Sequence, residues 1–175
     1  TQWIAQTKQM LDQPGITLRG MVGSAELATA YRRASFFAYP TAFMETGCIA
    51  LVKAMAFGAL PITSRFPESV LPELVGDLDL GPPLPSHLAV LVDEKGTVRP
   101  DPEAAKAWSM VGTPYFESLR FSAAFGDAVI SALRRERAPE LEALRQQLRK
   151  RAAESLTWEA AARTMLQRWH ADGLL

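Results

Sequence analysis

The spacing of hydrophobic positions along the chain changes several times and predicts alternating helices and strands. Apolar residues recur on one helical face in residues 2–11, whereas residues 16–22 alternate and begin with a β-branched side chain. This predicts a helix followed by a strand. Residues 25–34 return to helical spacing, with Ser24 as the expected N-cap. The aromatic run at residues 36–39 then predicts a second strand.

The most informative stretch of the pattern comes next. A polar loop carrying Glu45 leads into residues 49–57, which are apolar on every side except at Lys53, and this predicts a buried helix. Gly58 stands where a left-handed residue would end that helix, and residues 60–63 have the composition of a further strand. A strand, a helix and a strand of this size imply two parallel strands joined by a right-handed crossover.

The rest of the pattern is mostly helical. Residues 88–92 predict one more strand, and the predicted helices cover residues 101–111, 114–137, 139–156 and 158–169. The sequence therefore predicts an α/β domain with a Rossmann-like, mainly parallel sheet in residues 1–112. A helical C-terminal extension is expected in residues 113–175.

Composition excludes several classes of function. Nineteen basic and nineteen acidic residues give a net charge of zero, which argues against a nucleic-acid partner. The single cysteine excludes an internal disulfide, and with only His87 and His170 the sequence gives no basis for a metal site. We find neither an apolar run of transmembrane length nor a signal peptide, and we expect a cytoplasmic protein.

Glu45 and the helix start that follows it are the main candidates for chemistry. Ligands of open α/β sheets bind beyond the carboxyl ends of the strands, where the free N–H groups of a helix N-terminus attract anions. Gly47, Cys48 and Ile49 therefore stand where a phosphate-bearing ligand would bind, and Gly47 permits close backbone approach. Glu45 either accepts hydrogen bonds from sugar or ribose hydroxyls or simply caps the helix, and the residues alone leave both interpretations open.

Lys53 and Cys48 each allow two interpretations. A lysine on an apolar helix directs its ammonium either to solvent past the helix end or into the ligand cleft, because burying it unpaired is costly. Cys48, at a helix N-terminus, could have a lowered pKa, but a small buried core residue is the commoner case. Arg32 and Arg33 are interpreted as solvent-facing, and the charged face of residues 136–151 either faces solvent or contacts another domain.

Three segments, taken in order, carry a family resemblance: ITLRGMVGSAELATAYRRASFFAYPT, ETGCIALVKAMAFGALPITS and the terminal LTWEAAARTMLQRW. Together they resemble the C-terminal half of the group-1 glycosyltransferases, retaining nucleotide-sugar enzymes with the two-domain GT-B architecture. The resemblance covers residues 1–75 well, the last twenty residues moderately and residues 76–150 poorly. The combination is fairly specific, whereas any one segment would not be.

The resemblance implies that the domain binds a nucleotide sugar, such as a UDP-, ADP- or GDP-sugar, for glycosyl transfer with retention. Glu45 resembles the first acid of the family's E-x7-E pair, which lies near the donor sugar. Lys53 stands where the second acid, the usual ribose ligand, is found. The helix start that holds the diphosphate in the family corresponds to Gly47, Cys48 and Ile49.

The resemblance also sets expectations for residues and partners beyond that helix. Gly23 belongs to the segment that resembles the family's strand–glycine turn and is expected to contact the donor. Lys53 is a candidate for the cations that stabilise the leaving diphosphate, with no metal required. The family's other basic residues and its acceptor domain have no counterpart here. We therefore expect a glycan or small-molecule acceptor to bind a missing N-terminal domain, without which the chain is inactive.

Two alternatives to the transferase remain open at this point. One is a non-catalytic Rossmann-like interaction domain, which the lysine at position 53 favours. The other is a different GT-B enzyme, such as a sugar-nucleotide epimerase or a phosphorylase.

Overall fold

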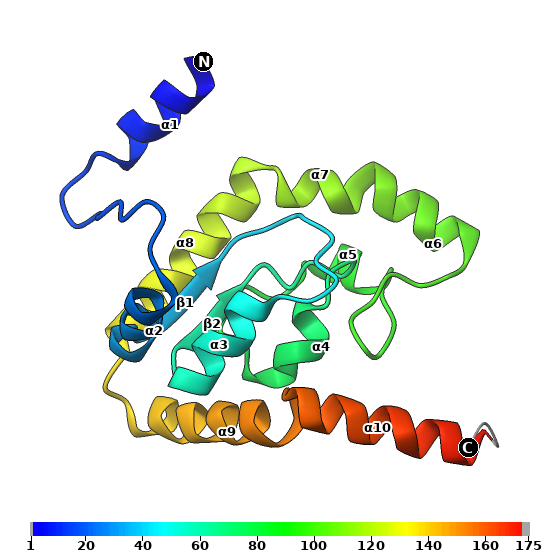
Figure 1. Ribbon diagram of the computed structural model, residues 1–175. Coiled ribbons are helices and arrows are strands. Elements are labelled where there is room, and N and C mark those ends of the chain that lie inside the picture. Colours follow the sequence, from blue (N-terminus) through cyan, green and yellow to red (C-terminus); the bar gives the residue numbers. More distant parts are fainter. Residues whose placement is uncertain (1, 173–175) are drawn as a thin grey trace.

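The protein folds around a small parallel sheet of two strands, surrounded by helices (Figure 1). The computed structural model describes residues 2–172, so Thr1 and residues 173–175, at the ends of the two predicted domains, lie outside the described residues. Strand β1 (Phe36–Tyr39) pairs with β2 (Leu60–Thr63), and Tyr39 lies opposite Thr63. The predicted α/β class is confirmed in this coarse form, a mainly helical chain with a two-stranded parallel sheet.

Helix α3 (Ile49–Phe57) connects the two strands over the residues that the sequence predicted. It ends at Gly58, whose φ of 90° is left-handed and whose N–H donates to carbonyl groups of the last turn. That conformation is comfortable for glycine because it has no Cβ. The predicted C-cap is therefore confirmed.

The expectation that α3 is buried on every side is wrong. Leu51, Ala54 and Met55 are fully buried, but Ile49 is 61% exposed and Lys53 is exposed as well. Only one face of α3 meets the sheet and its neighbours. No other element within residues 2–172 buries the apolar residues on the other face of α3.

Two predicted strands are absent from the structure. Residues 16–22 form a largely exposed link that pairs with no strand in the described part of the chain. Within residues 88–92, Leu88 belongs to the short helix α5 (Ser86–Ala89), and Val92 forms only an isolated antiparallel bridge with Val98. Leu88 is nevertheless fully buried, as its apolar pattern indicated, but it is buried from a helical turn and not from a strand.

Helices make up most of the remaining described chain. They are α1 (Gln2–Leu11), α2 (Ser24–Arg33), α4 (Leu71–Val75), the 3-10 turn η1 (Gly76–Leu78), α6 (Pro102–Ala107), the π-helical η2 (Trp108–Gly112), α7 (Thr113–Phe116), α8 (Leu119–Arg134), α9 (Pro139–Ser155) and α10 (Trp158–Ala171). The predicted break between the helices 101–111 and 114–137 does not occur, because the π-helical turn η2 continues directly into α7. The break comes instead at Ser118, whose hydroxyl accepts a hydrogen bond from Phe121 N and caps α8.

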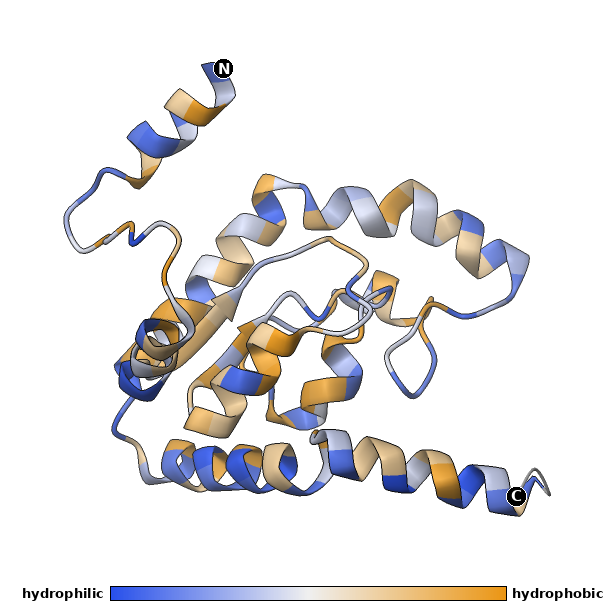
Figure 2. Cartoon of the chain, in the orientation of Figure 1, coloured by the Kyte–Doolittle hydropathy of each residue, from blue (hydrophilic) through white to orange (hydrophobic). Residues whose placement is uncertain are grey.

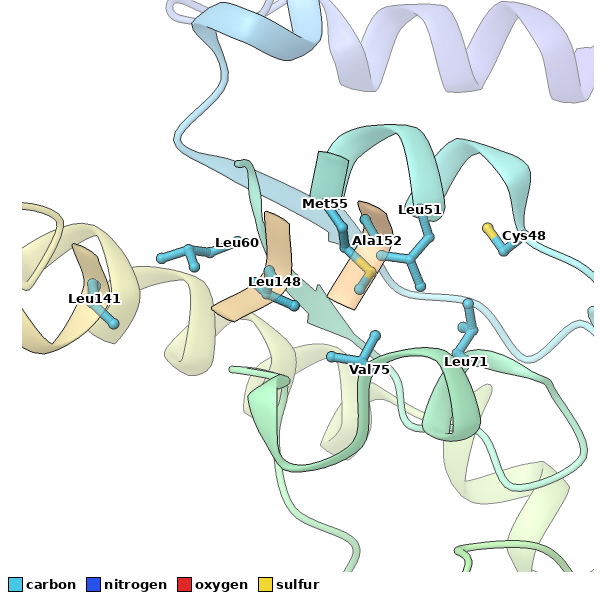
Figure 3. Packing of buried hydrophobic residues seen from close by; sticks show 9 residues of the cluster. All are labelled: Cys48, Leu51, Met55, Leu60, Leu71, Val75, Leu141, Leu148 and Ala152. Carbon is cyan, nitrogen blue, oxygen red and sulfur yellow. The ribbon is translucent and has the colours of Figure 1, made fainter. Parts of the chain in front are cut away.

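Two apolar clusters join the sheet to the helices that follow it. The first, shown in Figure 3, combines α3, β2 and α4 with three residues of α9, namely Leu141, Leu148 and Ala152. The second surrounds Trp108 and also includes Ile62 of β2 and Phe121 of α8. Both clusters therefore contain residues from each side of position 112. The division of the chain into two domains at that position stays a prediction.

The helices at the two ends of the chain have no buried residues. Helix α1 stands away from the body on an extended link, and α10 runs out beyond the sheet from the end of α9 (Figure 1). Both carry apolar residues on their surfaces (Figure 2), with Trp3 72% and Trp158 89% exposed. In residues 2–172 we find no helix that is both long enough and apolar enough to cross a membrane.

Candidate functional site

The carboxyl ends of β1 and β2 lie at the same edge of the sheet, and the loops that leave them are tied together. Tyr39 and Thr63 are the last residues of the two strands and are register partners. Beyond them, Ser64 Oγ donates a hydrogen bond to the carbonyl oxygen of Thr41, and Val70 N donates to Glu45 O over 2.8 Å. The loop at residues 41–46, which carries the predicted acid, is thus held in place by the segment after β2.

The side chain of Glu45 contacts the end of β1. Tyr39 donates its phenolic hydrogen to Glu45 Oε1 over 2.5 Å. This hydrogen bond to the carboxylate, helped by burial, raises the pKa of Tyr39 to about 12. Glu45 does not cap α3, because the N-cap residue is Cys48 and the cap makes no side-chain hydrogen bond. A carboxylate has several acceptor positions, so hydrogen bonding by Tyr39 leaves others free for a ligand hydroxyl.

Gly47, Cys48 and Ile49 form the turn into α3, as the sequence predicted. Gly47 is exposed, and a Cβ built on it would meet nothing within 4 Å, so the backbone here is open to a ligand. Ile49 N donates to Gly47 O over 3.0 Å and closes the turn.

The Cys48 side chain points into the core, with 5% of its surface exposed (Figure 3). Burial raises the pKa of its thiol, and the backbone N–H groups of Leu51 and Ala50 offset this only in part. Its interpretation as a core residue is therefore favoured over that of an activated thiol. Any ligand contact at this position would come from the backbone.

Lys53 lies one turn after Ile49 on the exposed face of α3, about 6 Å along the helix axis. The expectation that Lys53 lies on a buried helix face is wrong, because its side chain is exposed to solvent. Its positive charge therefore needs no partner in the core. Side chains on a helix lean toward its N-terminus, so Lys53 lies over the preceding turn of α3, at Ile49 and Ala50.

Gly23 lies apart from these residues along the chain, at the N-terminus of α2. It occupies the N-cap position itself, with φ −72° and ψ 163°, and Ser24 is the first helical residue. The prediction of Ser24 as the cap is therefore wrong by one position. Tyr31, near the other end of α2, stacks on Phe57 of α3 with ring centroids 6.3 Å apart, which fixes the two helices against each other. A donor contact at Gly23 stays a prediction.

Sequence reasoning missed a buried carboxylate beneath this edge of the sheet. Asp79 is 5% exposed and accepts hydrogen bonds from Thr63 N at 2.9 Å, from Gly81 N at 2.7 Å and from the Thr63 hydroxyl. A buried carboxylate needs such donors. Asp side chains commonly accept a hydrogen bond from the backbone two residues on, and Asp79 lies just before the glycine- and proline-rich loop at residues 81–85, so a turn at Asp79 was the available signal.

Arg65 follows β2 in a left-handed conformation, with φ 53°, which is uncommon for a residue with a side chain. Its backbone N–H donates to Thr63 Oγ1 over 3.1 Å, and its guanidinium donates to the carbonyl oxygen of Asp79. Arg65 Nε also lies 4.0 Å from Asp79 Oδ2. The Asp79 network therefore holds a partly exposed cation at the carboxyl edge of the sheet.

A hollow of about 380 Å³ adjoins the loop that carries Glu45. It is lined by Met44 of that loop and by residues after β2, among them Glu68, Val70 and Glu73. Within residues 2–172, no group of three or more His, Cys, Asp or Glu side chains is arranged to hold a metal ion. Comparisons of the chain with protein-family models, with curated proteins and with solved structures found no match.

Proposed function

We propose that this domain binds the nucleotide-sugar donor of a retaining glycosyltransferase. The observation that carries the proposal is the arrangement at the carboxyl edge of the sheet. Glu45 is fixed beside the end of β1, and the open turn at Gly47 leads directly into the N-terminus of α3. Such an edge is the usual ligand site of parallel α/β sheets.

The chemistry of the donor matches these groups. A helix N-terminus offers free N–H groups and partial positive charge to a diphosphate. In the proposal, the backbone N–H groups of Gly47 and Cys48 provide the cradle for the diphosphate, while Glu45 accepts a hydrogen bond from a donor-sugar hydroxyl. Lys53, exposed and leaning toward the same helix start, adds positive charge where negative charge grows as the diphosphate leaves.

The proposal extends to the protein in which this domain works. Transfer requires an acceptor, a glycan or a small molecule, bound by a further domain. The substrate is a UDP-, ADP- or GDP-sugar. An epimerase or a phosphorylase built on the same architecture would use the same donor site, and product analysis with the whole protein distinguishes them.

A second candidate function is a protein interaction domain without donor binding. It is favoured by the exposed apolar side chains of helices α1 and α10. Trp3 of α1 and Trp158 of α10 are 72% and 89% exposed, and neither helix contributes to the core. Exposed aromatic side chains of this kind are enriched in interfaces. This candidate predicts that nucleotides do not bind.

Titration with UDP, ADP and GDP, followed by amide chemical shifts, tests the proposal. We expect one of the three to bind and to move the signals of Gly47, Cys48 and Ile49 most. In calorimetry, Lys53→Ala should weaken that binding by roughly five- to tenfold, the effect of one charge-assisted hydrogen bond. Lys8→Ala on α1 removes the same charge far along the chain and serves as the control.

Each negative result has a defined meaning. If none of the three nucleotides binds, donor binding by this domain is refuted and the interaction domain is favoured. If a nucleotide binds equally well to Lys53→Ala and Lys8→Ala, Lys53 has no part in the site, although the helix start keeps its role.

A further inference from the structure

A cleft of about 450 Å³ with an arginine-rich lining opens at the opposite edge of the sheet. Its lining includes Ser35, the residue before β1, and Gly58, which lies two residues before β2. It therefore lies at the amino ends of the strands, about 13 Å, the length of a four-residue strand, from the edge that carries Glu45. We call it the arginine cleft, after Arg32, Arg33, Arg137, Arg145 and Arg149 in its lining.

Positive charge in the arginine cleft exceeds negative charge. Two carboxylates, Glu136 and Glu142, face the five guanidinium groups. Glu142 lies 3.6 Å from Arg145, and Glu136 accepts a hydrogen bond from the Ser35 hydroxyl. Of the five arginines, Arg145 is the one with an ion pair. No carboxylate in the described residues lies within ion-pair distance of the other four. A concave surface lined by one sign of charge concentrates ions of the opposite sign.

Besides Arg145, which pairs with Glu142, two more of the five arginines have contacts with their neighbours in the fold. Arg149 donates to Phe57 O over 3.4 Å and so satisfies a carbonyl at the end of α3. Arg32 donates to Thr29 Oγ1 over 3.1 Å and lies over the Phe57 ring, 5.7 Å from its centroid. Cations at helix C-termini are stabilised by the helix dipole.

Local structure does not account for Arg137. It stands two residues before Pro139, the first residue of α9, where the helix dipole disfavours a cation. Arg33 and Arg137 are both exposed, and the hydrogen bonds and ion pairs found among residues 2–172 engage neither guanidinium. These two arginines are therefore free to bind a ligand without loss of any contact within the protein.

We propose that the arginine cleft binds a small phosphorylated anion. Guanidinium groups present planar pairs of donors that match phosphate oxygens, and several around one space favour a ligand with two or more negative charges. The cleft has the volume of a small-molecule site, which favours a phosphate ester or diphosphate over a macromolecule. This site is separate from the proposed donor site and does not depend on it.

The test measures binding of inorganic pyrophosphate, a hexose 6-phosphate and citrate by calorimetry and amide chemical shifts. We expect the two phosphates to bind more tightly than citrate and to move the signals of Ser35 and Gly58. The double variant Arg33→Gln/Arg137→Gln should lose about tenfold or more in phosphate affinity. A preference for pyrophosphate over the sugar phosphate, or the reverse, distinguishes a diphosphate ligand from a monoester.

The double variant Arg99→Gln/Arg163→Gln removes the same charge from exposed sites outside the cleft and serves as the control. Equal affinity of the two double variants for both phosphates would overturn the proposal, as would citrate binding as tightly as the phosphates. Pyrophosphate shifts confined to Gly47, Cys48 and Ile49 would overturn it too, while supporting the donor site. Nucleotide shifts confined to the cleft would refute the donor site instead.

Discussion

The hydrogen bond between Tyr39 and Glu45 changes the pKa of Tyr39, which can be measured. The acceptor is the carboxylate of Glu45. An ionised Tyr39 would lose this hydrogen bond and would be repelled by the negative charge, so the Tyr39 hydroxyl stays protonated to high pH. The pKa of Tyr39 is accordingly raised from 10.0 to about 12. The folded protein thus holds a proton that the unfolded chain releases. This contribution to stability is complete below pH 10 and is lost as the pH rises from 10 to about 12.

The variant Glu45→Gln should lower the pKa of Tyr39 toward its ordinary value, because an amide accepts a hydrogen bond without the negative charge. A titration of tyrosinate absorbance reports this change, with Tyr39→Phe identifying which of the three tyrosines moves. Glu68→Gln, an exposed acid after β2, is the control and should leave the titration unchanged. An unaltered curve for Glu45→Gln would show that the hydrogen bond does not form in solution.

Gly81 is required by the close approach of the chain to the end of β2. A Cβ at this position would overlap the carbonyl oxygen of Thr63 and would lie 3.0 Å from Asp79 Oδ1. Because these atoms belong to the backbone and to a buried carboxylate, they have little room to move. The glycine therefore keeps the Asp79 network intact.

We expect Gly81→Ala to lower the free energy of unfolding by about 3 kcal/mol, at the upper end of the cost of overpacking. Gly126→Ala is the matched comparison, since that glycine lies inside α8 with open space around it, and it should stabilise by about 0.5–1 kcal/mol. Denaturant unfolding measures both. Equal effects of the two substitutions would contradict the packing at Gly81.

At the scale of elements, α9 shows how a highly charged helix can complete a core. Leu141, Leu148 and Ala152 form its narrow buried stripe and contact the first apolar cluster (Figure 3). Its polar side chains also reach the neighbouring elements, as Arg151 does by donating to Glu73 O over 2.6 Å. Removing the apolar stripe should therefore destabilise the sheet region and not α9 alone.

Leu148→Ala should lower the free energy of unfolding by about 2–5 kcal/mol, because Leu148 is fully buried and its truncation leaves a cavity. Gln147→Ala, on the exposed side of the same helix, should change it by less than about 0.5 kcal/mol. Denaturant unfolding of the two variants tests this contrast. A cost for Leu148→Ala as small as that for Gln147→Ala would show that α9 does not pack on the sheet.

The elements that the sequence predicted well are those whose pattern and end signals agree. For α3, the apolar run, the glycine at 58 and the flanking strands all indicate the same limits, which the structure matches. At residues 16–22 the alternation indicated a strand, but a strand forms only with a neighbour to pair its backbone groups. That neighbour depends on the tertiary structure, and the described chain provides none.

At the scale of the whole molecule, stability should be distributed unevenly along the chain. The sheet, α3 and α9 share the buried clusters, whereas α1 and α10 bury no residue. Helices without tertiary contacts are marginal in water, so their hydrogen bonds open easily.

Amide hydrogen exchange should therefore be fast throughout α1 and α10 and slow in β2, α3 and the inner face of α9. Measured by mass spectrometry or NMR on the whole chain, protection in β2 should approach the global free energy of unfolding. The exposed links between helices provide the unprotected reference in the same experiment. Strong protection of α1 or α10 would mean that their apolar faces are covered in solution, as the interaction-domain candidate expects.

The candidate site was only partly accessible to sequence reasoning. The turn at Gly47 and the helix start were found, because glycine and an apolar helical run leave local signals. The Tyr39–Glu45 hydrogen bond, the Asp79 network and the arginine cleft were not found, because each joins side chains that folding alone brings together. The arginine cleft is the extreme case, with contributions from α2 and from a helix more than a hundred residues later.

The sequence by itself determined the elements that local chemistry can define. Those were the strand–helix–strand unit around α3, the amphipathic helices of the C-terminal region and the zero net charge. Tertiary structure decided which apolar faces are buried. Lys53 and Ile49 are exposed on α3, although the sequence of α3 predicts a buried helix. The apolar residues of α1 and α10 are exposed as well. The physical reason is that periodicity records a face able to be buried, while burial requires a second surface that only the folded chain supplies.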